Sequence, residues 1–356
     1  MSGSEWLRFQ HELMTVFLFV SVLLNSFLVF LIQRKSPKNL GPYKYLMKFI
    51  SVFEIFYSIM DYLVLPVMHS HGSSFFIMTP IEDTMFNKPT ALVLQGVWCG
   101  FFGASMAIFG IHFVYRYLAV TGSRYINTFG GFKVLLWLLI PIVYGLIWGI
   151  IAYLCCGPKE VLAEYIRENL MESFELSVDD VVYIGPYFYA ENGDFNLDRD
   201  VILTIIFAVL IMASSLFTIF YFGAKCYLAL ARIQSTTGHS LHFQTLQTQF
   251  FTALVLQTVI PIALMHLPLM VNYASALANH GLGKLSNLAS ITIALYPVID
   301  PLPTLFIIKN YREAVKNFIF LPRKLFRCAV GKVLNTEVAS RKVSEQPESW
   351  NDEMIL

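Results

Sequence analysis

The sequence predicts an all-α membrane protein, a seven-transmembrane-helix bundle with its N-terminus outside and its C-terminus inside. Hydrophobic residues make up 56% of the 356 residues and charged residues only 14%, against about a quarter in a soluble domain. One soluble core cannot bury so much apolar mass, so we expect lipid to surround the chain. Basic residues gather on alternate sides of the apolar stretches, which gives the bundle its direction.

Seven stretches reach the roughly 20 apolar residues that a membrane-spanning helix needs. The fourth and fifth carry no charged residue, whereas the second contains Lys48, Glu54 and Asp61. Residues 1–12 then form an N-terminal segment outside the membrane, and residues 13–308 form the seven-helix domain. The predicted spans are Leu13–Ile32, Tyr45–Met68, Ala91–Val120, Val134–Cys156, Val201–Ala224, Phe250–Tyr273 and Leu285–Ile308.

The connections between the spans differ in charge on the two sides of the membrane. Basic residues follow the first, fifth and seventh spans, beginning with Arg34, Lys225 and Lys309. The third span ends with Arg116, and Arg124 and Lys133 follow it. The long connection Gly157–Asp200 contains eleven acidic residues instead. Excess lysine and arginine in short loops marks the cytoplasmic side, which places the N-terminus outside.

The connection Gly157–Asp200 is the one sizeable segment that this topology puts outside the cell. Its acidic residues recur every three or four positions from Glu160 to Glu175, which predicts a helix with a solvated face. Two interpretations remain open, a cap that keeps this end soluble and a lid that filters incoming molecules. The chain has no N-x-[ST] sequon, so N-glycosylation is not predicted.

Four stretches resemble one receptor family, in register with the seven spans. They are Lys35–Met47 (KSPKNLGPYKYLM), His112–Tyr117 (HFVYRY), Leu246–Pro261 (LQTQFFTALVLQTVIP) and Tyr296–Pro301 (YPVIDP). Together they are similar to the nematode seven-transmembrane chemoreceptors of the Str class, a divergent group of rhodopsin-like G-protein-coupled receptors that includes the diacetyl odorant receptor.

The resemblance implies a chemosensory, or odorant, receptor in the plasma membrane. Its expected partners are a small volatile or soluble ligand, a heterotrimeric G protein and the lipid bilayer. It further implies that the receptor lies in the cilium of a sensory neuron.

The likeness to rhodopsin-like receptors in general is more distant. Asn25 resembles the asparagine of their first helix, and Arg116 occupies the position of the arginine in their Asp-Arg-Tyr motif. Here Tyr115 replaces the acidic partner of that arginine, and no tyrosine follows Asp300–Pro301 at the expected place. The resemblance implies that Arg116 and Tyr117 contact the G protein. The alternative for Arg116 is that it anchors the helix to lipid phosphates.

Ionisable groups within membrane spans are costly and usually face the interior of the bundle. Glu54 lies ten residues after Lys44, which is about 15 Å along a helix and near the bilayer middle. We expect Asn25, Glu54 and Asp300 to form one interior polar network. Whether Glu54 binds sodium or is protonated and hydrogen-bonded to a neighbour stays open.

A ligand pocket is expected near the outer ends of the third, sixth and seventh spans, because pockets are concave, mostly apolar and carry few polar groups. Apolar walls with a few donors suit a small, weakly polar volatile. Gln95 and His266 are the polar side chains expected to meet a ligand, a water or each other. The candidate ligand-binding residues are Gln95, Trp98, Cys99, Phe102, Met265, His266, Leu269, Asn287, Ser290 and Thr292.

Beyond the seventh span, Tyr311–Leu321 places apolar residues on one side, which predicts a short amphipathic helix at the membrane surface within a segment 309–330. Cys328 is a candidate for lipidation by palmitate. Residues 331–356 are polar and are expected to be a disordered cytoplasmic tail.

Other functions find less support in the sequence. A seven-helix ligand-gated ion channel or a transporter is the alternative, although the chain shows no internal repeat. The chain carries no catalytic motif, so no enzyme is predicted, and the pair His239 and His242 is a weak metal signal. No cofactor is expected, since the seventh span lacks the lysine that retinal needs. A net charge of +1 gives no support to a nucleic-acid partner.

Overall fold

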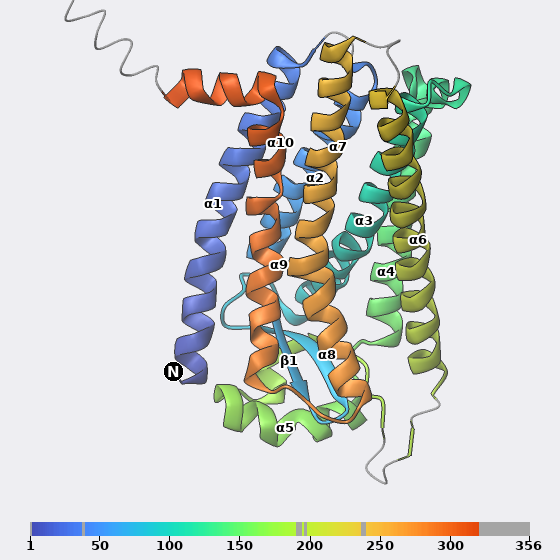
Figure 1. Cartoon of the computed structure of the whole chain (residues 1–356). Helices are drawn as coiled ribbons and strands as arrows, with labels where there is room; N and C mark the ends of the chain where they lie inside the picture. Colours follow the sequence, from blue (N-terminus) through green and yellow to red (C-terminus); the bar gives the residue numbers. More distant parts are fainter. Residues whose placement is uncertain (1, 38–39, 190–193, 196–197, 236–239, 320–356) are drawn as a thin grey trace, which may run out of the picture. The chain divides into compact units, whose positions relative to one another are not determined.

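The computed structural model describes residues 2–37, 40–189, 194–195, 198–235 and 240–319. The chain divides into two compact units, Met1–Tyr311 and Arg312–Leu356. The first unit is a bundle of long helices with a small sheet and one further helix at one end (Figure 1). The helices are α1 (Gly3–Lys35), α2 (Tyr43–Val64), α3 (Lys88–Val120), α4 (Val134–Cys155), α5 (Glu160–Phe174), α6 (Arg199–Ser235), α7 (Leu241–Pro261), α8 (Leu267–Leu277), α9 (Asn287–Ile299) and α10 (Pro301–Ile307).

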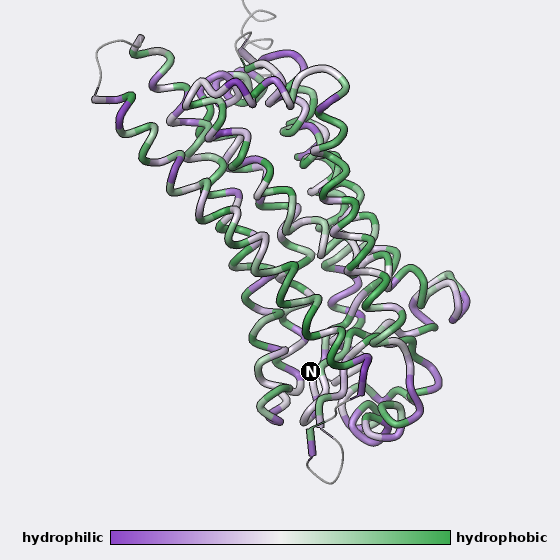
Figure 2. Tube along the Cα trace, turned by 90° about the vertical axis from the view of Figure 1, so that its right-hand side faces the viewer, coloured by the Kyte–Doolittle hydropathy of each residue, from purple (hydrophilic) through white to green (hydrophobic). Residues whose placement is uncertain are grey.

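The described helices form seven long helical runs that make up the bundle: α1, α2, α3, α4 and α6 are single helices, α7 continues into α8, and α9 continues into α10. A π-helical turn, η5 (Ile262–His266), joins α7 to α8. Six of the seven runs are long and apolar enough to span a membrane, and the remaining one, α2, carries the charged residues seen in the sequence. Figure 2 shows the long helices hydrophobic over most of their length. The shorter 3₁₀ turns are η2 (Arg124–Phe129), η3 (Gly131–Lys133), η4 (Val178–Asp180) and η6 (Lys284–Ser286).

Helix α3 runs through the middle of the bundle, whereas α4 faces outward. In an apolar stretch of 18 residues within α3, 67% is buried, against 17% in the corresponding stretch of the helical run that contains α4. The two helices touch through glycines: a Cβ atom added at Gly100 would lie 2.9 Å from the carbonyl oxygen of Gly145. Small residues let helix backbones approach this closely. The contact also seats Trp148 of α4 against Gly103 of α3.

A three-stranded antiparallel sheet covers one end of the bundle, which we call the capped end. Its strands are β1 (Val67–His71), β2 (Ser74–Pro80) and β3 (Val181–Ile184), in the order β1-β2-β3. Val67 pairs with Met78, and Ile77 pairs with Ile184. A two-residue turn begins at Gly72, whose φ of +48° favours glycine.

The two faces of the sheet pack against different layers, as the alternation of side chains along a strand requires. Met68, Phe75 and Ile77 belong to the core of the bundle. Phe76 and Tyr183 belong to a second core that the sheet forms with α5. Bundle, sheet and α5 are therefore three stacked layers, and the sheet is buried on both sides.

The structure differs from the predicted spans at several boundaries: α6 continues to Ser235, past the predicted end at Ala224, and α7 begins at Leu241, before the predicted start at Phe250. The second span was expected to run to Met68, but α2 ends at Val64, Leu65 is left-handed (φ 49°) and Met68 lies in β1. Pro66 cannot continue the helix. The apolar sequence nevertheless continues into the buried strand β1, so hydrophobicity alone does not mark the end of α2. Helix α1 begins at Gly3 rather than at Leu13, because Ser2 and Glu5 form a capping box.

The predicted acidic helix occurs as α5, and its opposite face is apolar and packed on the sheet. Leu162, Ile166 and Leu170 are buried there. Within the predicted surface segment, residues 309–319 are helical. Cys328, the tail 331–356 and His239 lie outside the described residues.

Candidate binding site

A cavity of about 50 Å³ lies between the bundle and the sheet. Helices α3, α4, α6 and α8 form its walls, and residues of the sheet and of the segment after β3 form its roof. A water molecule needs about 10–15 Å³ in this measure, so the cavity has room for a small molecule. Its lining consists of Met68, Phe75, Ile77, Trp98, Cys99, Phe102, Trp148, Ile151, Ala152, Cys156, Ile184, Gly185, Pro186, Thr204, Phe207, Ala208, Ile211, Leu269 and Tyr273.

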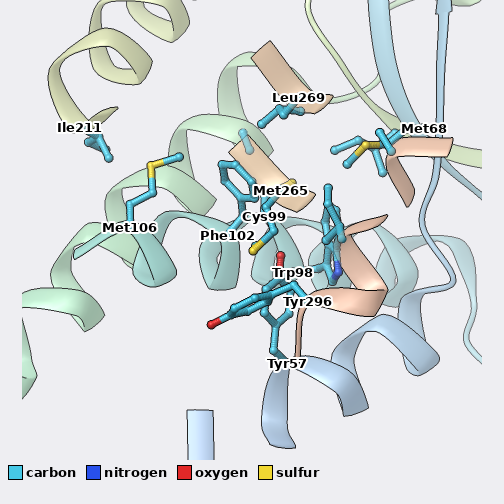
Figure 3. Close-up of a cluster of buried hydrophobic side chains, with 14 of the residues drawn as sticks. Tyr57, Met68, Trp98, Cys99, Phe102, Met106, Ile211, Met265, Leu269 and Tyr296 are labelled. Atoms are coloured by element: carbon cyan, nitrogen blue, oxygen red, sulfur yellow. The ribbon is translucent and has the colours of Figure 1, made fainter. Parts of the chain in front are cut away.

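Several of the residues expected to bind a ligand come together around this cavity. Trp98, Cys99 and Phe102 line it from α3, and Leu269 lines it from α8. Met265 is fully buried in the same apolar cluster, next to Cys99 and Phe102 in Figure 3. The thiol of Cys99 is free.

Gln95 lies beside the cavity rather than on its lining. Its amide nitrogen donates a hydrogen bond of 2.6 Å to the carbonyl of Ile77 in β2. The side chain therefore ties the roof to α3. Its amide oxygen is buried and has no hydrogen-bond partner among the residues that the structure describes.

His266 lies behind Phe102, at the end of the π-helical turn. The two rings meet edge to face with their centroids 5.5 Å apart. Both ring nitrogens are buried, and neither has a hydrogen-bond partner within the described part of the chain. Pro261 and Pro268 flank this turn, and such single-turn bulges often occur at functional sites.

The polar candidates of the seventh run support the sheet instead of lining the cavity. The hydroxyl oxygen of Ser290 accepts a hydrogen bond of 2.7 Å from the backbone nitrogen of Met68. Thr292 donates to the carbonyl of Ala289 in its own helix. Asn287 is buried and interacts with His69 of β1.

His69 joins the three layers at the capped end. Its Nε2 lies 2.8 Å from the amide oxygen of Asn169 in α5, and its ring packs edge-on against Phe76 and Phe174. Burial lowers the pKa of His69 below its usual range, although the contacts with Asn169 and Asn287 act in the opposite direction. The neutral ring is therefore the form that the closed cap favours.

A buried polar group lies directly beside the wall formed by Trp98. The indole nitrogen of Trp98 donates a hydrogen bond of 2.6 Å to Oδ1 of Asp61 in α2. The ring of Tyr57 lies 6.4 Å from that of Trp98 and 6.1 Å from that of Tyr296 (Figure 3). These rings connect the cavity with the middle of the bundle.

The structure brings Asn25, Glu54 and Asp300 together in the middle of the bundle. The hydroxyl of Tyr296 donates to Oε1 of Glu54 at 3.2 Å, and Glu54 also interacts with the side chains of Asp300 and Asn25. A hydrogen bond between two carboxyl groups requires that they share a proton. The amide of Gln257 in α7 donates to Oδ2 of Asp300 at 2.9 Å, which ties α7 to this cluster.

Asn25 also satisfies a carbonyl that proline leaves free. Pro301 has no N–H, so the carbonyl of Pro297, four residues earlier, lacks its helical partner. The side-chain nitrogen of Asn25 donates to that carbonyl at 2.9 Å, and the hydroxyl of Ser21 does so at 3.3 Å. Helix α1 is thus fixed to the junction between α9 and α10.

Arg116 lies at the end of the bundle opposite the cap, which we call the Arg116 end. Its guanidinium carbon lies 3.7 Å from the ring centroid of Tyr43 in α2 and 4.4 Å from that of Phe250 in α7. One guanidinium nitrogen donates to Oε1 of Gln247 at 3.1 Å. Arg116 is only 2% exposed. Two aromatic rings and an amide therefore hold it in place of the acidic residue that precedes this arginine in rhodopsin-like receptors.

Tyr117 points away from Arg116 toward α6. Its ring lies 5.6 Å from that of Phe222, and the amino group of Lys225 lies 5.8 Å above it. The two residues that the resemblance assigns to G-protein contact therefore have different neighbours.

Most residues of the roof and of the α4–α6 wall were not predicted from the sequence. Residues 74–79 (SFFIMT) follow a glycine turn, which is a hairpin signal. The run was too uniformly apolar to show alternation, since both faces of the sheet are buried. The sequence did not identify Phe207 and Ile151 as lining residues, because every face of their helices is apolar and no pattern marks the face toward the cavity.

The chain is similar to known membrane receptors over most of its length. A sequence profile described as "Serpentine type 7TM GPCR chemoreceptor Str" matches residues 10–316. The chain is 37% identical to G-protein coupled receptor str-217 of Caenorhabditis elegans, over 88% of this chain and 90% of the relative. It is 30% identical to Serpentine receptor class r-10 of the same organism, over 90% of this chain and 93% of that relative. Its fold resembles squid rhodopsin, with a TM-score of 0.61 at 9% identity, over 89% of this chain and 87% of that one.

Proposed function

Because the chain belongs to the Str family of serpentine seven-transmembrane G-protein-coupled chemoreceptors, we propose that its cavity binds a small odorant and that binding activates a heterotrimeric G protein. The members of this family are receptors and not enzymes. The observation that carries the proposal is the apolar cavity between helices beside Trp98, Cys99 and Phe102. The lining suits a small, weakly polar molecule.

The proposed orientation places the capped end outside the cell and the Arg116 end in the cytoplasm. It rests on the charge of the connections, since basic residues follow the runs that end near Arg116 and acidic residues fill the connection that carries α5. With this orientation the ligand reaches the outer half of the bundle and the G protein binds at its inner end. The cilium of a sensory neuron is the proposed location.

Helix α7 offers a physical connection between the two ends. Near its end, Gln257 binds Asp300 of the central cluster, and nearer its start Gln247 and Phe250 hold Arg116. A displacement of α7 would break both sets of contacts together. The proposal is that a ligand pressing on Trp98 disturbs Tyr57 and Tyr296, and that this shifts α7 and frees Arg116 for the G protein.

Expression in cultured cells with a panel of volatile and soluble chemicals, read out by calcium or cAMP, tests the proposal. Cys99→Phe fills the cavity and is expected to abolish the response to any active compound. Val97→Phe is the matched control, because Val97 is 43% exposed on the outside of the same helix. An unchanged half-maximal concentration in Cys99→Phe at matched surface levels would place the binding site elsewhere.

A further inference from the structure

We propose that the ligand reaches this cavity from the hydrocarbon of the membrane, through an opening between α4 and α6, and not from water through the cap. The inference rests on the proposed function of the cavity and narrows the ligand to apolar molecules that partition into lipid. Three features of the structure support it: a closed roof, a half-open side wall and a lining with few available donors.

The roof is closed by backbone pairing and by a second layer. All residues of β1 and β2 except His71 are buried, as are all residues of β3. Gly185 lies so close to β2 that a Cβ atom there would be 2.4 Å from the carbonyl oxygen of Phe75. At the hairpin turn, a Cβ atom on Gly72 would lie 2.1 Å from the hydroxyl of Tyr165 in α5. Neither contact leaves room for a molecule to pass.

Hydrogen bonds fasten this roof to the bundle on several sides. The backbone nitrogen of Gly185 donates to the carbonyl of Cys156 at 2.8 Å, and Gln95 and Ser290 hold β2 and β1 as described above. Lys159, which precedes α5, pairs with Asp198 and Asp200 at 2.9 and 2.8 Å. Opening the cap would therefore require breaking contacts in three layers at once.

The side wall between α4 and α6 is the part of the lining that reaches the outside. Trp148 and Ile151 of α4 and Phe207 and Ala208 of α6 are only half-buried, whereas the lining residues of the sheet are buried. The two helices lie next to each other in the bundle (Figure 1). Tyr273 of α8 is the remaining half-buried lining residue among those described.

This opening faces lipid rather than water. Phe207 lies eight residues into α6, which is about 12 Å along the helix. The neighbouring outward residues are apolar and exposed, with Ile150 and Leu154 of α4 at 52% and 65% and Leu210 of α6 at 59%. Such surfaces on spanning helices face the hydrocarbon. A molecule passing between Ile151 and Phe207 therefore comes from the membrane.

The lining also selects against strongly polar ligands. The donor of Trp98 is engaged by Asp61, and the hydroxyl of Thr204 donates to the carbonyl of Asp200 at 2.8 Å. The thiol of Cys156 lies 3.2 Å from Thr204. The side-chain donors of Trp148 and Tyr273 remain for a ligand. A ligand that needs many hydrogen bonds would lose them on leaving water without replacement, so the ligands are mainly apolar and carry few acceptors.

Thiol labelling of Cys99 tests the route without a known ligand. The full-length receptor in lipid nanodiscs is treated with uncharged N-ethylmaleimide or with the permanently charged reagent MTSET, and labelling of Cys99 is read by peptide mass spectrometry. Each rate is divided by the rate of that reagent with glutathione. N-ethylmaleimide is expected to label Cys99 at least tenfold faster than MTSET on this scale.

Variants of the opening and of the cap distinguish the two routes. Phe207→Ala widens the opening and is expected to raise the rate with N-ethylmaleimide several-fold, while Ala208→Trp lowers it. Phe220→Ala is the matched control, since Phe220 is 66% exposed on the same helix and lines no described cavity. Asn169→Ala loosens the cap and is expected to leave both rates unchanged.

Two results overturn the lateral route. The first is that N-ethylmaleimide labels Cys99 no faster in Phe207→Ala than in the wild type or in Phe220→Ala. The other is an MTSET rate that matches the N-ethylmaleimide rate or rises in Asn169→Ala, since either shows passage from water through the cap. Labelling requires no signalling, so these outcomes are independent of the cavity-filling test of the proposed function.

Discussion

Trp98 lines the cavity with its ring and donates its indole hydrogen to Asp61 at 2.6 Å. This bond joins α3 to α2 directly beside the space where a ligand would lie. Asp61 is only 3% exposed, so its carboxyl group depends on the protein for hydrogen bonds. The pair is thus both a support of the cavity wall and the first polar contact beyond it.

Asp61→Leu is expected to destabilise the receptor more than Asp61→Asn. Leucine leaves the buried indole donor without a partner, which costs about 1–3 kcal/mol, whereas asparagine retains an acceptor oxygen. Thermal unfolding of the purified receptor in detergent measures the difference. Equal melting temperatures for the two variants would show that the Trp98–Asp61 bond contributes little to stability.

Gln95→Leu is expected to lower stability and surface expression and to leave the potency of an active ligand unchanged. The reason is that Gln95 fastens β2 to α3 and does not line the cavity. The loss of this buried hydrogen bond amounts to about 1 kcal/mol. A shifted half-maximal concentration with normal expression would instead mean that Gln95 contacts the ligand.

Phe250→Ala is expected to raise signalling in the absence of ligand, because it removes one wall of the aromatic enclosure around Arg116. Arg116→Ala is expected to reach the cell surface and to lose ligand-dependent signalling. Basal cAMP or calcium at matched surface levels measures the effect of Phe250→Ala. The cAMP or calcium response to an active compound measures the effect of Arg116→Ala.

The adjacent Phe251 provides the control for this enclosure. Its ring contacts Phe113 and not Arg116, so Phe251→Ala should leave the basal signal unchanged. Full signalling by Arg116→Ala would identify the arginine as a lipid anchor alone.

Acidification is expected to loosen the cap through His69. Since burial lowers the pKa of His69 in the closed cap, the charged form favours the released state. The stabilising contribution is therefore complete above the ordinary histidine pKa of about 6.5 and declines as pH falls below it. His71 and Lys284 add positive charge nearby and act in the same direction.

Hydrogen exchange of the amides in β1 and α5 measures this effect, after correction for the intrinsic pH dependence of exchange. Exchange should be faster at pH 5.5 than at pH 7.5 in the wild type, and His69→Phe should remove the difference. An identical pH dependence in His69→Phe would assign the effect to other groups.

The proposed orientation of the chain predicts which epitope tags antibodies reach on intact cells. Tags at the N-terminus or within the connection between α5 and η4 should stain without permeabilisation, and a tag at the C-terminus should not. Surface staining of the C-terminal tag would reverse the proposed topology.

The sequence predicted the helical bundle well because lipid imposes one strong requirement, a long apolar run, at each crossing. It also singled out Trp98, Cys99 and Phe102, since spacings of three and four put them on one face of a helix. Gln95 has the same spacing, and its role as a tie to the roof depends on a strand that the sequence did not reveal.

The sheet β1-β2-β3 could not be predicted from the sequence, for a physical reason. Pro66 ends α2, yet Val67 and Met68 extend the same apolar run into β1, so the hydropathy of the sequence is continuous where the backbone changes from helix to strand. The surroundings of His266 could not be predicted from the sequence either. Its isolation from hydrogen-bond partners depends on how η5 turns the ring toward Phe102, and a π-helical turn has no signature in the sequence beyond its flanking prolines.

The glycine contact between α3 and α4 divides the receptor mechanically. The backbones at Gly100 and Gly145 pack so closely that no Cβ atom fits between them, and this close packing favours α3 and α4 moving together. Conformational change at the Arg116 end would then come from the helices that meet α3 through long side chains, above all α7 with Gln247 and Phe250. The fixed half of the receptor would act as the frame against which the other half tilts.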